Sequence, residues 1–332
     1  MTWFEDLAGF REESPDQVRQ HLSVDGNKLK SRINGREYIW GSLEIPTLAE
    51  LRQRAKSLDS VGGRVSVREI VADAQDLHAD PASAGAMFQV ASQFNLLEMM
   101  NPGVIPEAGV GGYEQDHTQG PACAIAAGAG TIYRNYFAGV NGQTGQSAGS
   151  QIDCLNDVGE ALGNADNRLW EMKNGYALAT EEGLKEISRR LLSASEQDRD
   201  ELRRLLRIGL QWDTEVTIAN TGQLVSQAYC SALPVACSPY ASELWVPFAR
   251  LILEASYEST FCAAVLNASR TGNTTLYLTL LGGGAFGNRT EWITDAVTRS
   301  LKIHENSSLD VAIVSYGASN SDVQRLVRSF SG

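Results

Sequence analysis

A stretch in the first half of the chain gathers acidic side chains that could carry out acid–base chemistry. Residues 94–121, the acidic loop, read FNLLEMMNPGVIPEAGVGGYEQDHTQGP and hold little other charge. The acidic and histidine side chains in it are Glu98, Glu107, Glu114, Asp116 and His117. Carboxyl groups can protonate a leaving group, orient hydroxyls or activate water, which is the chemistry of glycosidic-bond hydrolysis. Some of them can equally be solvated carboxylates, and His117 can be structural or a proton shuttle.

A glycine-rich segment in the last third of the chain is the second candidate site. TTLYLTLL indicates a buried strand, the glycine loop GGGAFGN (282–288) follows, and a helix is expected over 289–302. This order of elements suits phosphate binding, because glycines let a diphosphate approach the main chain and a helix start offers unpaired N–H groups. A tight turn needed only for packing is the plainer interpretation.

The G-x-G-x-x-G spacing of residues 282–287 also matches the Rossmann pattern, so an NAD-binding protein is an alternative. A Rossmann unit needs an acidic residue at the end of the next strand to hold the ribose. Here that strand, DVAIVSYG, ends in Ser315 and Tyr316, and its acid, Asp310, lies at its start. Too little chain follows to complete half of such a fold. The context therefore argues against the Rossmann interpretation.

LTLLGGGAFGNRTEWITDAVTRSL and the following LDVAIVSYG resemble the second ligand loop of macrodomains. The resemblance implies that the glycine loop wraps the diphosphate and proximal ribose of ADP-ribose, with Phe286 near the distal ribose. The first ligand loop of that family follows a strand that ends near an asparagine, and MFQVASQFNLLEMM offers such a strand with Asn95. The likeness covers residues 87–121 and 277–330.

The acidic loop resembles poly(ADP-ribose)-glycohydrolase-like macrodomains, and more closely the bacterial-effector macrodomain hydrolases that remove ADP-ribose from ubiquitin. That resemblance implies Asp116 as the principal catalytic acid or water-orienting carboxylate, with Glu107 and Glu98 in support. The glycohydrolase pattern of three glycines and a Glu-Glu pair is absent, because GVGGYEQD has Glu114 and Asp116 around a glutamine. This departure argues against poly(ADP-ribose) as the substrate.

The same resemblance implies a set of ligand-binding residues in the two loops. They are Asn95, Glu114, Gln119, Gly120, Gly282, Gly283, Gly284, Ala285, Phe286, Gly287 and Asn288. No cofactor is expected. No metal is expected either, because the four histidines are far apart and the five cysteines include no CxxC.

Alternating strand and helix patterns must position these loops. They predict an α/β fold, and the resemblance implies a macrodomain-like three-layer α/β/α arrangement with a mixed, largely parallel central sheet. We expect an N-terminal α+β extension over residues 1–80 and an ADP-ribose-binding domain over 81–332, with a helical insertion around 181–210. Hairpins are expected at Asn34-Gly35 and, with a plain turn as the alternative, at Asn174-Gly175. One helix is expected over 121–137.

The amino-acid composition limits the partners that the protein can bind and the places where it can work. The net charge of −12 makes nucleic acid an improbable partner, because phosphate backbones are bound by clustered Lys and Arg. The start of the chain is acidic and no apolar run is long enough to span a membrane, so we expect a cytoplasmic protein or an effector secreted into a host cytosol. The expected function is binding of ADP-ribose and metal-free hydrolysis of an ADP-ribosyl bond on a protein such as ubiquitin. The alternatives are a non-catalytic ADP-ribose reader and a protein whose loops only pack.

Overall fold

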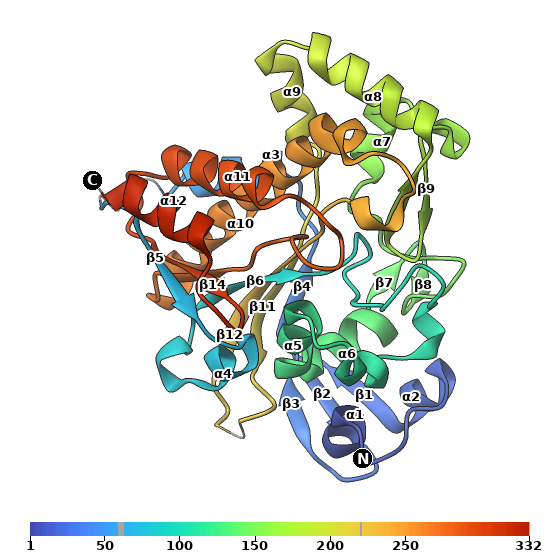
Figure 1. Cartoon of the computed structure of the whole chain (residues 1–332). Coiled ribbons are helices and arrows are strands. Elements are labelled where there is room, and N and C mark those ends of the chain that lie inside the picture. The colour runs from blue at the N-terminus through green and yellow to red at the C-terminus, as the bar shows by residue number, and fades with distance from the viewer. Residues whose placement is uncertain (59–62, 220, 332) are drawn as a thin grey trace.

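A seven-stranded sheet forms the centre of the computed structural model, which describes residues 1–58, 63–219 and 221–331 (Figure 1). The strands, in sheet order, are β4 (Ser42–Glu44), β11 (Gly209–Glu215), β12 (Leu224–Cys230), β6 (Met87–Ala91), β13 (Thr275–Leu278), β14 (Asp310–Ser315) and β5 (Ser66–Val71). β11 is antiparallel to both of its neighbours, and the other neighbouring pairs are parallel. The expected α/β fold with a mixed, largely parallel sheet is confirmed.

Helices cover both faces of this sheet, which gives three layers (Figure 1). One layer holds α3 (Leu48–Lys56), α10 (Val246–Thr271), α11 (Thr290–Ile303) and α12 (Ser321–Ser331), and the other holds α4 (Ala74–Ala79), α5 (Gln119–Ala126) and α6 (Gly128–Tyr136). The strand β14 is apolar on both faces because helices cover both. α10 is buried around most of its circumference, since it packs between the sheet and its neighbours α3, α8 (Glu181–Ser193) and α11.

The first 80 residues build a small layer of their own and also enter the central sheet. The small layer consists of α1 (Trp3–Ala8), α2 (Pro15–His21), β1 (Leu22–Asp25), β2 (Lys28–Ser31) and β3 (Glu37–Ile39). The Asn34-Gly35 hairpin is confirmed, because β2 and β3 pair antiparallel around it. Further along, β4 and β5 are the two edge strands of the central sheet. The segment that we expected to be an extension therefore supplies both sheet edges.

The middle of the chain forms a second peripheral group, at the top and right of Figure 1. Its elements are β7 (Gly139–Val140), β8 (Gln143–Thr144), α7 (Asn156–Leu162), β9 (Trp170–Lys173), β10 (Tyr176–Ala179), α8 (Glu181–Ser193) and α9 (Glu196–Arg203). The hairpin at Asn174-Gly175 is confirmed. The expected helical segment over 181–210 is too long, since α9 ends at Arg203 and residues 209–210 already belong to β11.

The single helix expected over 121–137 is two helices, α5 and α6, with a break at Ala127. Thr217 explains the break. Its N–H donates to the Ala126 carbonyl (2.9 Å), and its hydroxyl accepts from the Gly128 N–H (3.0 Å). These bonds take main-chain groups that an unbroken helix would pair internally. The local sequence could not show this, because Thr217 lies almost 90 residues further along the chain.

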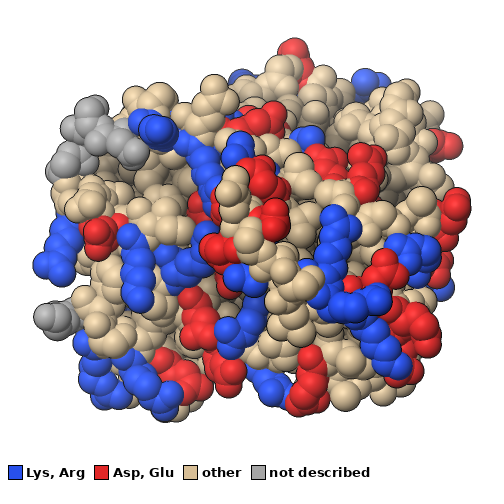
Figure 2. Space-filling view, turned by 90° about the horizontal axis from the view of Figure 1, so that it is seen from above, with Lys and Arg blue, Asp and Glu red and all other residues tan. Residues whose placement is uncertain are grey.

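No helix in the described ranges is long and apolar enough to cross a membrane. On the face seen from above, over α8, α9 and α11, positive and negative side chains alternate without a broad patch of one sign (Figure 2). Many of these charges are partners in ion pairs, for example Arg168 with Glu186 and Lys185 with Glu181.

Candidate functional site

A cavity of about 450 Å³ opens at the carboxyl ends of the central strands. Residues just beyond four strands line it: Ser92 after β6, Ala232 after β12, Thr279 after β13 and Tyr316 after β14. Ligands of open α/β sheets bind in this position, outside the carboxyl ends of the strands. The acidic loop and the glycine loop both reach this cavity.

The glycine loop forms one wall of the cavity. Gly282 has a φ of 75°, and a Cβ atom there would lie 2.4 Å from the Ala232 Cβ, so a side chain does not fit. A Cβ atom at Gly284 would have no neighbour within 4 Å, so this residue borders open space at the cavity. Asn288 closes the loop from behind, because its side-chain amide donates to the Leu233 carbonyl (2.8 Å). α11 begins directly after the loop, at Thr290.

The first turn of α5 forms the opposite wall. Thr118, Gln119 and Gly120 all line the cavity. A Cβ at Gly120 would lie 2.0 Å from the Ala91 carbonyl oxygen, so only glycine lets this helix start against the end of β6. The Thr118 side chain makes no capping hydrogen bond in the described structure. N–H groups at such a helix start are suited to an anion such as a diphosphate.

Two aromatic rings form an apolar part of the cavity lining. The rings of Phe286 in the glycine loop and Tyr176 on β10 are 5.2 Å apart and tilted by 49°. Hydrogen bonds fix the Tyr176 side chain and the main chain of Phe286. The Tyr176 hydroxyl donates to the Met99 carbonyl (2.6 Å), and the Phe286 carbonyl accepts from the Ala236 N–H (3.0 Å). A ribose or a base can pack against these two rings.

Glu98 is the most unusual group in the cavity lining. Its side chain is almost wholly buried, with an exposed fraction of 1%, and neither carboxyl oxygen has a hydrogen-bond partner in the described part of the chain. Burial raises the pKa of Glu98 to about 8, against the opposing charge of Arg134 and with a further rise from the charge of Asp116. The group is therefore a neutral carboxylic acid at neutral pH, with a proton that it can donate.

Arg134, on α6, is the positive charge behind Glu98. Its side chain is fully buried, donates to the Leu96 carbonyl (3.1 Å) and the Thr131 hydroxyl (3.0 Å), and lies 3.6 Å from the centre of the Tyr229 ring. Within the described residues it forms no ion pair. Arg134 thus acts on Glu98 through space and leaves the carboxyl oxygens free.

The structure brings several of the predicted site residues together at the cavity. Asp116 lines it beside Glu98, and its Oδ1 accepts from the Thr118 N–H (2.9 Å). The predicted ligand-binding residues that also line it are Gln119, Gly120, Gly282, Gly283, Gly284, Ala285 and Phe286. Gln119 is partly engaged elsewhere, because its side-chain oxygen accepts from the Ala74 N–H (2.7 Å).

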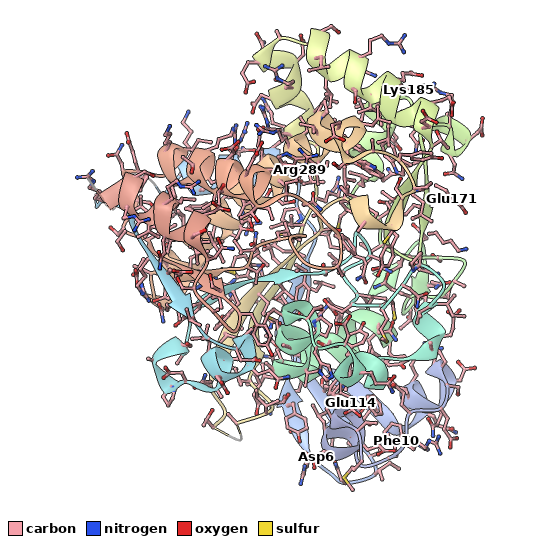
Figure 3. The ribbon with its side chains drawn as sticks, viewed as in Figure 1. Asp6, Phe10, Glu114, Glu171, Lys185 and Arg289 are labelled. Atoms are coloured by element: carbon pink, nitrogen blue, oxygen red, sulfur yellow. The ribbon has the colours of Figure 1, made fainter. Side chains whose placement is uncertain are left out.

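Other predicted site residues lie outside the described lining of this cavity. They are Asn95, Glu107, Glu114, Gly287 and Asn288. Both Glu107 oxygens accept from the Ala148 N–H (2.9 and 3.0 Å), and the Asn95 amide donates to Gln151 (2.8 Å). Glu114 is exposed next to the N-terminal helices (Figure 3) and lines a separate hollow of about 360 Å³ that also includes Asp116. Their predicted roles stay predictions.

Tyr176, Met100 and Tyr316 are among the lining residues that the sequence analysis did not propose as site residues. Tyr176 follows the Asn174-Gly175 turn, and the Gly175 carbonyl accepts from the Phe94 N–H (3.0 Å), which docks that hairpin on the acidic loop. Met100 and Tyr316 are about half exposed, at 52% and 59%. The position of Met100 within the acidic loop and that of Tyr316 after a predicted buried strand were the only sequence signals for these two.

Comparisons with known proteins give distant likenesses only. No protein-family model matches the sequence, and no curated protein matches it either. Among solved structures, a poly(ADP-ribose) glycohydrolase from Deinococcus radiodurans in complex with ADP-ribose is 10% identical, with a TM-score of 0.45 over 97% of this chain and 99% of that chain. The glycohydrolase from Thermomonospora curvata bound to the inhibitor ADP-HPD is 11% identical, with a TM-score of 0.44 over 95% and 97%. We take the function from the site and not from these likenesses.

Proposed function

We propose that the cavity binds ADP-ribose and that the protein hydrolyses an ADP-ribosyl bond. The observation that carries the proposal is Glu98, a buried carboxyl with a pKa of about 8 and unpartnered oxygens in the lining of a nucleotide-sized cavity. A carboxyl that stays protonated at neutral pH is suited to general acid catalysis. A strongly shifted pKa in a cleft is also a general mark of functional sites.

The two walls of the cavity suit the diphosphate of ADP-ribose. The main chain at Gly284, which borders open space, and the first turn of α5 offer N–H groups, which bind phosphate oxygens without cationic side chains. Phe286 and Tyr176 offer apolar rings for the ribose or the base. A volume of about 450 Å³ lies in the usual range of small-molecule sites.

Glu98 and Asp116 have different roles in the proposed reaction. As the bond between the anomeric carbon and the acceptor breaks, its electron pair stays with the acceptor, which takes the Glu98 proton. The Asp116 carboxylate stabilises the positive charge that develops on the ribose and orients the water that attacks the anomeric carbon. One proton of that water restores Glu98, so the products are ADP-ribose and the protonated acceptor. The two carboxyls need no metal for these steps.

The acceptor that we propose is a mono-ADP-ribosylated protein, with ubiquitin as the candidate implied by the sequence resemblance. Met100 and Tyr316 support a macromolecular substrate, because both line the cavity and are half exposed at its mouth. Apolar and aromatic side chains in that position can contact a protein surface around the modified residue. A non-catalytic reader would bind ADP-ribose between the same two walls and would not need the Glu98 proton.

The test measures release of ADP-ribose from mono-ADP-ribosylated ubiquitin and from poly(ADP-ribose), together with calorimetric binding of ADP-ribose. Wild type should release ADP-ribose, while Glu98→Gln and Asp116→Asn should bind it with little release. The control is Glu171→Gln, since Glu171 is exposed on β9 away from the cavity lining (Figure 3). Binding without release by wild type on every substrate would replace the hydrolase with a reader. Absence of binding would contradict both.

A further inference from the structure

The N-terminal segment and the acidic loop share one hydrophobic cluster. Phe4 and Leu7 on α1 belong to it together with Leu97 and Val110 of the acidic loop and Ile132 of α6. The cluster is distinct from the larger core around α10. The acidic loop is therefore packed against the start of the chain and not only against the central sheet.

Glu12 holds the acidic loop from this side by two hydrogen bonds, and a third ties Glu12 to α6. Its Oε1 accepts from the Val110 N–H (3.0 Å) and from the Tyr136 hydroxyl (2.6 Å), and its Oε2 accepts from the Gly111 N–H (2.6 Å). Gly109 makes room for this carboxylate, because a Cβ there would lie 2.5 Å from the Glu12 Cδ. Burial raises the pKa of Glu12, and the three bonds oppose that rise.

Trp3 holds the same turn at two further points. Its indole N–H donates to the Val110 carbonyl (3.1 Å), and its main-chain N–H donates to the Glu114 carboxylate (3.1 Å). Val110 is thus fixed at its N–H by Glu12 and at its carbonyl by Trp3. We call Trp3 and Glu12 the N-terminal clamp.

The clamped turn leads directly to both candidate catalytic carboxyls. The 3-10 helix η3 (Gly111–Gln115) begins at the residue that Glu12 binds. Within it, the Tyr113 hydroxyl accepts from the Glu98 N–H (3.0 Å), and the Tyr113 carbonyl accepts from the Asp116 N–H (3.1 Å). One tyrosine therefore fixes the main chain of Glu98 and of Asp116, and the clamp fixes the helix that carries this tyrosine.

We propose that Glu12 is a positioning residue for the reaction: through Val110, Gly111 and Tyr113 it sets the placement of Glu98 and Asp116 in the cavity. The inference rests on the proposed function for its effect on turnover. It makes the N-terminal segment part of the catalytic apparatus. Catalytic groups need to be held within a fraction of an ångström, and a loop that carries them outside the central sheet depends on such anchors.

The test compares Glu12→Ala with Glu13→Ala, because Glu13 is the exposed neighbour and its side chain makes no hydrogen bond or ion pair among the described contacts. Glu12→Ala should lower kcat on the ADP-ribosylated substrate by about 10- to 100-fold, as misplacement of catalytic groups does. The KM and the Kd for ADP-ribose should stay within about 3-fold, because the glycine loop and α5 are untouched. Unchanged kcat, or an equal loss of ADP-ribose binding, would overturn the proposal.

Hydrogen exchange of the amides over residues 98 and 110–116 gives a readout that needs no activity. Glu12→Ala should speed their exchange at least about 10-fold relative to Glu13→Ala, because three anchoring bonds are lost. If wild type is inactive and this acceleration is seen, the proposed function fails while the clamp stands. If wild type is active and these amides are as protected in Glu12→Ala as in Glu13→Ala, the positioning role of Glu12 is contradicted while the proposed function stands.

Glu12→Ala leaves two main-chain N–H groups without a partner and can fail to fold. In that case Tyr136→Phe and Trp3→Phe test the proposal, since each removes one hydrogen bond around Glu12 and Val110. Each should lower kcat by about 3-fold with the Kd for ADP-ribose unchanged, in proportion to one lost hydrogen bond. Wild-type kcat in both folded variants would overturn the positioning role.

Discussion

Glu98 and Glu258 are both buried glutamates, yet their surroundings are opposite. Glu258, on α10, receives hydrogen bonds from Arg52 (2.5 and 2.9 Å) and Arg299 (2.5 Å), and Arg52 also binds Asp200. Burial alone would raise its pKa, but these two arginines hold the pKa of Glu258 below its usual value. Glu98 has no such partner among the described residues, and burial raises its pKa to about 8.

The difference shows which buried acid serves stability and which is free for chemistry. Glu258 joins α3, α9, α10 and α11 into one ion-pair cluster on the side of the sheet that holds α11, and its charge is matched there. Glu98 lies in the wall of a cavity, where an unmatched ionised carboxylate would be costly and the proton is retained. A fold that needed only packing at this position would place an apolar side chain there.

The largest expected effect separates the two glutamates by activity. Glu98→Gln should lower kcat for ADP-ribose release by about 10³-fold, because it removes the proton donor while keeping the shape of the side chain. Glu258→Gln, where it folds, should keep kcat within about 3-fold, since it does not touch the cavity. Single-turnover release assays measure both. Equal kcat losses in the two variants would show that Glu98 is no more important for the reaction than Glu258.

The next effect separates them by stability. Glu258→Gln should lower the free energy of unfolding by about 3 kcal/mol, because Arg52 and Arg299 lose their buried anionic partner and then share Asp200. Glu291→Gln is the matched control: Glu291 pairs with Arg250 at an exposed position, so the expected loss is below about 1 kcal/mol. Urea unfolding measures both changes. A loss for Glu258→Gln no larger than the control would show that the cluster does not stabilise the fold.

The pH dependence of stability should have opposite signs at the two sites. The folded-state pKa of Glu98 is about 8 and that of an unfolded glutamate is 4.5, so its contribution is present below pH 4.5 and is lost as the pH rises through 8. Between pH 5.5 and 7.5 the stability advantage of Glu98→Gln over wild type should grow by about 3 kcal/mol, at about 1.4 kcal/mol per pH unit. Glu258 contributes stability above pH 4.5 that is lost on acidification. Parallel wild-type and Glu98→Gln profiles would show that Glu98 is ionised.

The smallest expected effect concerns binding alone. Phe286→Ala should weaken ADP-ribose binding by about 10-fold, the loss of one aromatic contact, with unfolding unchanged because the ring is only partly buried. Calorimetry and urea unfolding give the two values. Unchanged affinity would place the ligand away from Phe286, while a large loss of stability would make the ring part of the core.

Local signals in the sequence predicted much of the fold. The turns at Asn34-Gly35 and Asn174-Gly175 each need glycine after asparagine, and both form hairpins. The glycine loop between β13 and α11 lies where a buried strand gives way to an amphipathic helix. In each case the information lies within about ten neighbouring residues, so one sequence is enough.

The site needed contacts that no local pattern records. Glu98 and Glu107 are the same residue type in the same loop, but one retains a proton in the cavity and the other binds the Ala148 N–H. Glu98 is the buried one of the two because of the packing of α6 and Tyr113 around it. Tyr176 enters from the β9–β10 hairpin, and Glu12 reaches Val110 across 98 positions in the chain. Long-range packing of this kind cannot be deduced from one sequence.

Thermal unfolding with added ligand is the most direct test of whether the cavity between the glycine loop and α5 binds ADP-ribose. A ligand that binds only the folded state at 100 times its Kd stabilises it by about 2.7 kcal/mol. For a chain of this size we therefore expect millimolar ADP-ribose to raise the Tm by several degrees, on the order of 4 °C, and NAD to raise it less. An unchanged Tm with ADP-ribose, or a larger rise with NAD, would contradict the account.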